Sequence, residues 1–256
     1  MLCAHNYCSL PLPDMPTPPS SLHVSLSQAP LARLDSLRYI LERSEAIYPK
    51  EQALALAVAA EALGNAEVLR DCLTLGLEYG ATPHEFYEAF LQTYLFAGFP
   101  AALEAIALLH TVCKERGLRF DAPSKADIDV AHFQERGQQL CEAIYTTTYS
   151  KMRTNLQTLS PDLAEWMIVE GYGKTLSREG VLPRLRELLI VSVLAVTGWK
   201  TQLYSHLRGA MNLGAAPIEC IDILNNLDVF DEPHIQERVR AAKLVLESVL
   251  GRTTHA

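Results

Sequence analysis

Three side chains in the segment GWKTQLYSHLRGAMNLG (residues 198–214) have types and spacing that suit a chemical site. Trp199, Gln202 and His206 recur at intervals of three and four residues, which in a helix brings side chains to one face. Imidazole is well suited to acid and base catalysis near neutral pH, and an amide can donate to a substrate carboxylate. The segment therefore predicts a helix face that is a catalytic site, a redox site without its thiols, or ordinary packing.

A carboxylate on the preceding predicted helix lies within reach of this histidine. Gly198 separates the two helices, with Glu187 before it and His206 after it. At a rise of about 1.5 Å per residue, the two side chains lie within about one turn of each other along antiparallel helices. A carboxylate beside an imidazole fixes its tautomer and suits general acid/base catalysis. The alternative is a core or interface histidine that Glu187 satisfies without chemistry.

The elements that must position these groups are helices, because apolar residues recur with helical periodicity and alternating strand-like runs are nearly absent. The predicted helices cover residues 31–47, 50–63, 66–79, 83–97, 101–115, 128–150, 161–172, 182–197, 200–213, 217–227 and 232–250. Prolines at the first position of a helix, at Pro83 and Pro217, and glycines at its end, at Gly80 and Gly214, support several of these boundaries. The fold class is therefore predicted to be all-α.

The chain also repeats itself at an offset of 134 residues without a gap. Gly64 aligns with Gly198, and Pro83 aligns with Pro217. Matching turn residues mark backbone geometry rather than burial alone. We interpret the sequence as two tandem helical units, at residues 31–118 and 119–256, after a disordered proline-rich tail at residues 1–30.

The second repeat resembles a known family. The strings RELLIVSVLAVTGWKTQLYSHLRGAMNLGAAPIE, FQERGQQLCEAIY and SPDLAEWMIVEGYGKTLSREGVLPRLREL resemble the carboxymuconolactone decarboxylase family, within the alkylhydroperoxidase D-like superfamily. The resemblance covers about residues 131–227, and in the first unit about residues 50–110, including YLFAGFPAALEAI. It implies two alkylhydroperoxidase D-like units packed about a pseudo-two-fold axis, and association into a homo-oligomer, here a trimer of tandem units.

The resemblance assigns roles to individual positions. In thiol-dependent members a CxxC pair opens the second hairpin helix, and Trp199 and Gln202 stand where those cysteines would be. His206 and Glu187 match the family histidine and glutamate. The first unit has Cys72 at the histidine position, which leaves a single-cysteine redox activity as an alternative. Dithiol peroxidase chemistry needs an attacking and a resolving thiol, and neither unit provides the pair.

The decarboxylase branch of the family also lacks the dithiol. Its substrates are small carboxylated lactones, and it needs no cofactor. Loss of CO2 leaves an enolate, so the site needs cations for carboxylates and an acid that returns a proton to carbon. Arg178 and Arg186 match the family arginines, and together with Gln202 and Trp199 they are the predicted substrate-binding residues. Surface ion pairing is the alternative for both arginines.

Composition narrows the remaining possibilities. The formal net charge is −8, with 22 basic and 30 acidic residues, which disfavours nucleic acid and anionic membranes as partners. The longest apolar run, residues 188–196, is too short for a membrane span. The six cysteines lack CxxC spacing, and the histidines lack HxxxH or HExxH patterns, so we expect reduced thiols, a cytoplasmic protein and no metal site.

Three functions follow from the sequence. The first is a cofactor-free lyase or isomerase that acts on a small carboxylated lactone or related acid through His206 and Glu187. The second is a degenerate alkylhydroperoxidase or peroxiredoxin-type protein that uses Cys72. The third is a non-catalytic oligomeric helical binding module.

Overall fold

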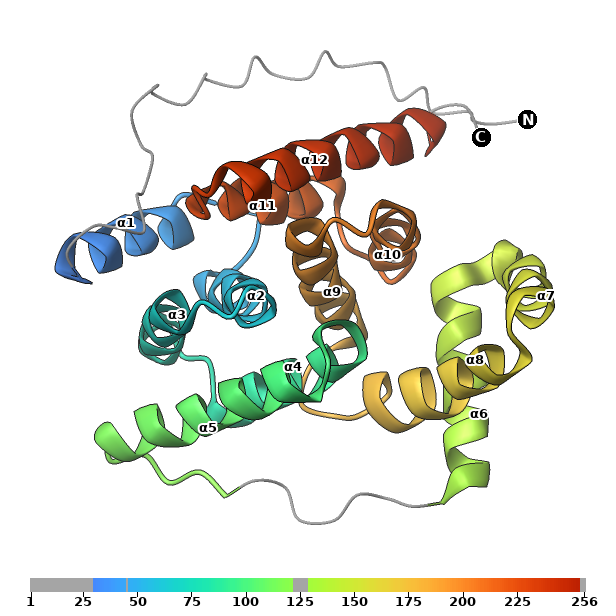
Figure 1. Cartoon of the computed structure of the whole chain (residues 1–256), viewed down its shortest axis with the longest axis horizontal. Coiled ribbons are helices and arrows are strands. Elements are labelled where there is room, and N and C mark those ends of the chain that lie inside the picture. The colour runs from blue at the N-terminus through green and yellow to red at the C-terminus, as the bar shows by residue number, and fades with distance from the viewer. Residues whose placement is uncertain (1–29, 45, 122–128, 254–256) are drawn as a thin grey trace, which may run out of the picture.

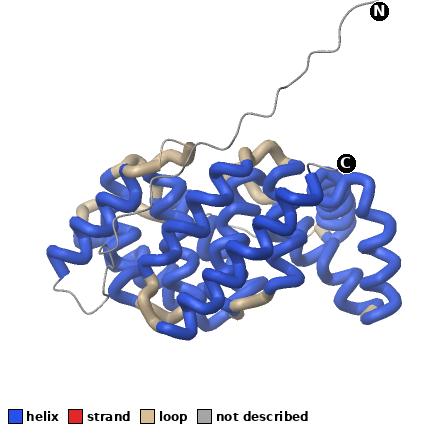
Figure 2. The backbone as a smooth tube through the Cα atoms, turned by 90° about the horizontal axis from the view of Figure 1, so that it is seen from above, coloured by secondary structure: helices blue, strands red, loops and turns tan. Residues whose placement is uncertain are grey.

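The computed structural model describes residues 30–44, 46–121 and 129–253, and every regular element in this part of the chain is a helix (Figures 1 and 2). The all-α prediction is confirmed. The predicted tail at residues 1–30 falls, apart from Pro30, outside the described residues. The elements are α1 (Pro30–Glu42), α2 (Pro49–Ala62), α3 (Ala66–Glu78), α4 (Pro83–Ala97), α5 (Phe99–Glu115), α6 (Val130–Tyr145), η1 (Thr146–Thr148), α7 (Tyr149–Leu159), α8 (Pro161–Trp166), η2 (Met167–Leu176), α9 (Pro183–Thr197), α10 (Lys200–Asn212), α11 (Pro217–Asn226), η3 (Leu227–Val229) and α12 (Pro233–Thr253).

Local signals fix the helix boundaries where the sequence placed them. The side chain of Thr82 accepts from the backbone of Glu85, and the Glu85 side chain accepts from the backbone of Thr82, which closes a capping box at the start of α4. Gly80 and Gly214 end α3 and α10 with φ of 88° and 96°, a conformation that favours glycine. The predicted C-terminal caps are confirmed.

Helices α2 and α9 pack against each other at the centre of the molecule, with α11 and α12 on one side and α4 and α5 on the other (Figure 1). All residues from Leu185 to Val196 of α9 are buried, so this helix is surrounded by its neighbours. Helix α3 packs on α2, and α10 packs on α9, each as the second arm of a hairpin. The predicted bend between α9 and α10 lies at Gly198, whose φ is 85°.

Three predicted helices differ from the observed ones by more than a few end residues. The helix predicted at 31–47 ends at Glu42. The helix predicted at 128–150 ends at Tyr145, because Thr146 takes a positive φ of 47° and a short 3₁₀ turn follows before α7. The helix predicted at 161–172 widens after Trp166 into the ten-residue π-helix η2. Hydrophobic periodicity detects a helix but does not resolve a change from α to π winding.

Glycines allow α6 and η2 to lie in close contact. A Cβ atom at Gly137 would overlap the carbonyl oxygen of Ile168, and one at Gly173 would overlap the carbonyl oxygen of Phe133. This close approach brings α6 and η2 together with α7 and α8 at one end of the molecule (Figures 1 and 2). No helix of the described part of the chain is both long and apolar enough to cross a bilayer.

Candidate functional site

The structure brings Glu187 of α9 and His206 of α10 together. Nδ1 of His206 lies 2.9 Å from Oε2 of Glu187, and the two side chains are 9% and 2% exposed. The antiparallel hairpin produces this contact, since both residues lie a comparable distance from the bend at Gly198. Because Glu187 engages Nδ1, Nε2 is the ring nitrogen left for another molecule. A neutral imidazole with its proton on Nδ1 can therefore accept a proton at Nε2.

A glycine makes room for this pair. A Cβ atom at Gly209 would lie 2.5 Å from Oε2 of Glu187 and 2.8 Å from Cγ2 of Ile144. Gly209 follows His206 by three residues on the same helix, so the carboxylate occupies the space that a side chain would take. The sequence contained this signal, in HLRG, but only the structure shows which group fills the space.

Two tyrosines from α6 and η2 border the same buried region. The hydroxyl groups of Tyr145 and Tyr172 lie 2.9 Å apart, and Tyr172 is buried. Burial raises the pKa of Tyr172 well above its usual range, and the neighbouring Tyr145, Glu187 and Cys141 raise it further. Both phenols therefore stay protonated at neutral pH and act as hydrogen-bonding groups. Sequence reasoning did not identify either tyrosine.

Trp199 and Gln202 do not share a buried face with His206. Trp199 precedes the first residue of α10 and is 59% exposed, and Gln202 is exposed as well. The start of α10 lies at the surface, and the helix becomes buried only one turn later, at Leu203 and His206. The prediction of one shared inner face is wrong, because helical periodicity gives the direction of a side chain but not the depth of the helix.

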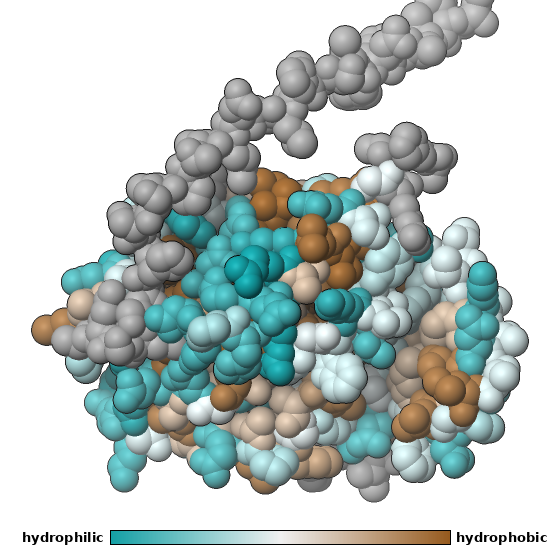
Figure 3. All heavy atoms as spheres, turned by 45° about the horizontal axis from the view of Figure 1, so that its top comes forward, coloured by the Kyte–Doolittle hydropathy of each residue, from teal (hydrophilic) through white to brown (hydrophobic). Residues whose placement is uncertain are grey.

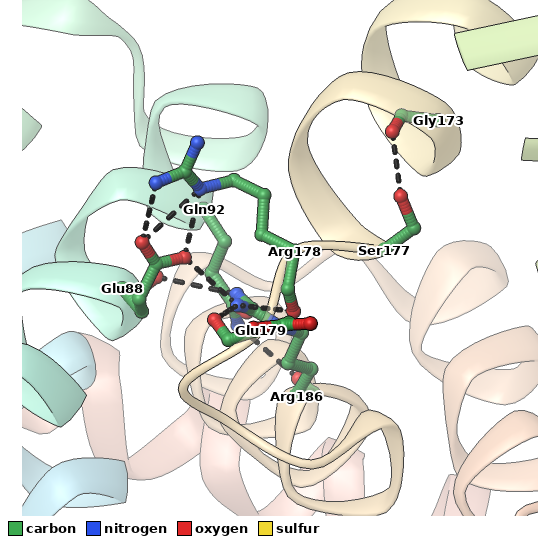
Figure 4. Close-up of polar contacts among 7 residues, drawn as sticks. All are labelled: Glu88, Gln92, Gly173, Ser177, Arg178, Glu179 and Arg186. Atoms are coloured by element: carbon green, nitrogen blue, oxygen red, sulfur yellow. Dashed lines mark hydrogen bonds and ion pairs between the residues drawn. The ribbon is translucent and has the colours of Figure 1, made fainter. Parts of the chain in front are cut away.

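The two predicted substrate-binding arginines converge instead on a glutamate of the first half (Figure 4). Arg178 donates from Nε and Nη2 to the carboxylate of Glu88 at 2.6–3.1 Å. Arg186 donates from Nη2 to Glu88 at 2.9 Å and from Nη1 to Gln92 at 3.0 Å. Arg186 is buried and paired with Glu88, which are the contacts of a structural counterion, and its role in substrate binding stays a prediction. The side chain of Arg178 remains 26% exposed.

The two arginines determine the ionisation state of Glu88. Burial raises the pKa of Glu88, but hydrogen bonds and charge from Arg178 and Arg186 outweigh burial, so its pKa is lowered and it is ionised. The two guanidinium groups share the single carboxylate of Glu88. Arg186 also donates hydrogen bonds from Nη2 to the backbone carbonyls of Arg178 and Glu179. Sequence reasoning missed Glu88, although the 134-residue offset aligns it with a second acid, Asp222.

Cys72 has neither of the properties that a redox thiol needs. It is 1% exposed, and burial together with the negative charge of Asp71 raises the pKa of its thiol. A reactive cysteine is accessible and has a lowered pKa. The single-cysteine redox prediction is therefore wrong. The other cysteines within the described residues, Cys113, Cys141 and Cys220, are also free and buried.

A shallow hollow of about 520 Å³ lies on the outer side of α10, against α12. Its walls combine hydroxyl and apolar groups, among them Tyr204, Ser205, Leu244 and Val245. Figure 3 views the molecule from the side that brings α12 forward, and hydrophobic residues form small separate patches among hydrophilic ones there. His206 does not line this hollow. Within the described ranges, no group of three or more His, Cys, Asp or Glu side chains is placed to hold a metal ion.

The fold and the site define an all-α protein with a buried glutamate–histidine pair between two helical hairpin arms. No family model matches the sequence. The chain is 30% identical over 152 residues to Peroxisomal protein 2 of Schizosaccharomyces pombe, a match that covers 58% of this chain and 70% of that protein. The chain therefore belongs to the same family as Peroxisomal protein 2. The resemblance to the carboxymuconolactone decarboxylase family stays a prediction.

Proposed function

We propose that this protein is a cofactor-free lyase or isomerase of the carboxymuconolactone decarboxylase type, with His206 as general acid/base and Glu187 as the group that orients it. The observation that carries the proposal is the buried 2.9 Å contact between the two side chains. A buried ion-pairing or hydrogen-bonded polar pair costs desolvation free energy that an apolar pair does not. Its presence inside the hairpin supports a functional role.

The proposed chemistry needs few groups besides His206 and Glu187. In a decarboxylation of a carboxylated lactone, the C–C bond electrons pass into an enolate as CO2 leaves, and the protonated imidazole returns a proton to carbon. In an isomerisation, the neutral imidazole first removes the proton and then returns it elsewhere. Arg178, with its partly exposed guanidinium group, is the cation that we propose for a substrate carboxylate.

The test is turnover of a panel of small carboxylated lactones by the wild type and by His206→Ala. We expect the variant to lose about 10²–10⁴-fold in kcat, the usual contribution of a general acid/base. Circular dichroism and size-exclusion chromatography of both proteins control for folding and assembly. Equal turnover by the variant would refute the acid/base role.

A non-catalytic binding module is the second candidate. The low exposure of His206 and the engagement of both arginines by Glu88 favour it. Binding of the same lactones without turnover, measured by calorimetry, would distinguish it from a lyase. A thiol peroxidase has the least support, because Cys72 is buried.

We also infer that the chain consists of two units related by a pseudo-two-fold axis. The helix pairs α2 and α9, α3 and α10, α4 and α11, and α5 and α12 each begin 134 residues apart. Contacts between the halves are reciprocal at the same offset: Gln52 accepts from Asn226, and Arg186 bonds to Gln92. Such an exchange of partners supports a two-fold relation.

A homo-oligomer, specifically a trimer of these double units, remains our proposal for the assembly. Light scattering should give a mass of about 85 kDa, three times 28.4 kDa. A mass near 28.4 kDa would refute it.

For localisation, our proposal is the cytoplasm, in keeping with the free thiols of the described cysteines. The name of the Schizosaccharomyces pombe relative makes the peroxisome the alternative. Immunofluorescence of the untagged protein, with markers for both compartments, distinguishes the two.

A further inference from the structure

The imidazole of His206 is contacted by an aromatic ring from the other half of the molecule. Phe96 lies on the last turn of α4, and its ring centroid is 5.6 Å from that of His206, with an interplanar angle of 85°. Edge-to-face geometry at this distance is a favourable aromatic contact. Phe96 is only partly buried, whereas His206 is buried.

Two further helices border the histidine. Glu187 engages Nδ1 from α9, and beyond Glu187 the side chain of Ile144 from α6 closes the space at Gly209. His206 keeps 9% of its side-chain surface. Of the side chains that border this pair, Glu187 and Ile144 are buried and Phe96 is partly exposed, so we infer that a molecule reaches Nε2 past Phe96.

Phe96 lies between a hydrogen-bonded contact of α4 with η2 and the turn that ends α4. Two residues earlier, the hydroxyl of Tyr94 lies 2.9 Å from Oγ1 of Thr175 and 3.2 Å from Oε1 of Glu170, which ties α4 to η2. Two residues later, Gly98 ends α4 with φ of 86°, and α5 begins in a new direction. Phe96 therefore lies on the last turn of α4, between the tie at Tyr94 and the turn at Gly98.

We propose that Phe96 is the specificity-determining residue of the His206 site: its ring closes the approach to the imidazole and offers an incoming ligand an aromatic face. The class of ligand that fits is a small planar, unsaturated acid, whose flat face replaces the aromatic contact. The ligand class rests on the proposed function, whereas the control of access to His206 does not.

Access is measured with diethyl pyrocarbonate, which acylates the unprotonated imidazole nitrogen, by peptide mass spectrometry of the full chain. Phe96→Ala should raise the rate of modification at His206 by about tenfold, the upper effect of losing one aromatic contact. Phe96→Trp should lower it. Leu103→Ala is the matched control, because this apolar side chain lies on α5 beyond Gly98 and is 65% exposed, and it should leave the rate unchanged.

The thermal midpoint of each variant, measured by circular dichroism, shows whether it is folded, and Phe96→Leu replaces Phe96→Ala if the alanine variant unfolds. A rate at His206 that is the same in the wild type, in the smaller variant and in Phe96→Trp would overturn the proposal. The outcome is independent of turnover. If the rate of modification at His206 follows the size of residue 96 while His206→Ala keeps full activity, Phe96 controls access to His206 and the acid/base role is refuted.

Discussion

The two central hairpins, α2–α3 and α9–α10, have corresponding boundaries but bury different chemistry. At the aligned positions the first hairpin buries Ala53 and Cys72, whereas the second buries Glu187 and His206. At these two positions the first hairpin has apolar groups, so a polar pair there is not needed to build the hairpin. The comparison therefore separates what the fold requires from what a site requires.

A second pair of aligned positions supports this comparison. The first hairpin has a small residue at Ala53 and a large one at Leu75, and both are fully buried. The second has the large Glu187 and, aligned with Leu75, the minimal Gly209. The exchange keeps the buried volume similar, which close-packed interiors demand. The absence of a side chain at Gly209 therefore leaves the space that the Glu187 carboxylate occupies.

The largest difference between the halves should lie in their aligned acids. Glu88→Ala leaves Arg178 and Arg186 without their anion, and we expect a loss of about 3–5 kcal/mol in the free energy of unfolding. Asp222→Ala, the aligned change, removes only a hydrogen bond from Ser44 and should cost about 1 kcal/mol. Urea denaturation of both variants measures the difference, and equal losses would contradict the account.

The same glutamate gives the fold a dependence on low pH. Because the pKa of Glu88 is lowered in the folded protein, its stabilisation is present above the unfolded value near 4.5 and is lost as the pH falls through the lowered folded value. The acid limb of the stability curve should therefore flatten in Glu88→Ala relative to the wild type.

Glu61 should act in the opposite sense. Burial raises its pKa to about 8, and the single proton of the Thr93 hydroxyl cannot serve both Glu61 and the carbonyl of Phe90, which supports a protonated Glu61. The stabilisation that Glu61 contributes is complete below pH 4.5 and is lost as the pH rises towards 8. At about 1.4 kcal/mol per pKa unit, the free energy of unfolding should fall by a few kcal/mol over this range. Glu61→Gln should remove this slope in urea melts from pH 4.5 to 9. An unchanged slope would show that another group titrates. The aligned residue in the second half is Ala195, which is buried and has no carboxylate.

A smaller effect is expected at Gly209. Gly209→Ala places a methyl group 2.5 Å from Oε2 of Glu187 and should cost about 1–3 kcal/mol, because the carboxylate must move. The cost should largely disappear when the same change is made in a Glu187→Ala background. A double-mutant cycle of unfolding free energies checks this, and additive losses would show that the two positions are not coupled.

The smallest effect is expected for Cys72. Its thiol is buried and its pKa is raised, so iodoacetamide should alkylate it far more slowly in the folded protein than a free cysteine. Mass spectrometry of Cys72 peptides over time, with urea-unfolded protein as the reference, gives the rate. Rapid alkylation of the folded chain would restore the redox hypothesis.

The sequence predicted the hairpins well and their surroundings poorly. Gly198 and the separations of Glu187 and His206 from it were enough to place the two side chains in contact, because helix geometry is local. Trp199 was misplaced, because burial depends on which elements cover a helix end. Glu88, Phe96 and Tyr172 lie far from His206 in sequence, and only the packing of α4 and η2 on the second hairpin reveals them.

The most direct test of the central claim uses imidazole nitrogen signals of ¹⁵N-histidine-labelled protein while a small unsaturated carboxylated lactone is added. The account predicts that the His206 signals move in the wild type and that a Cys72→Ala variant behaves as the wild type does. His206 signals that stay unchanged at every concentration would contradict it.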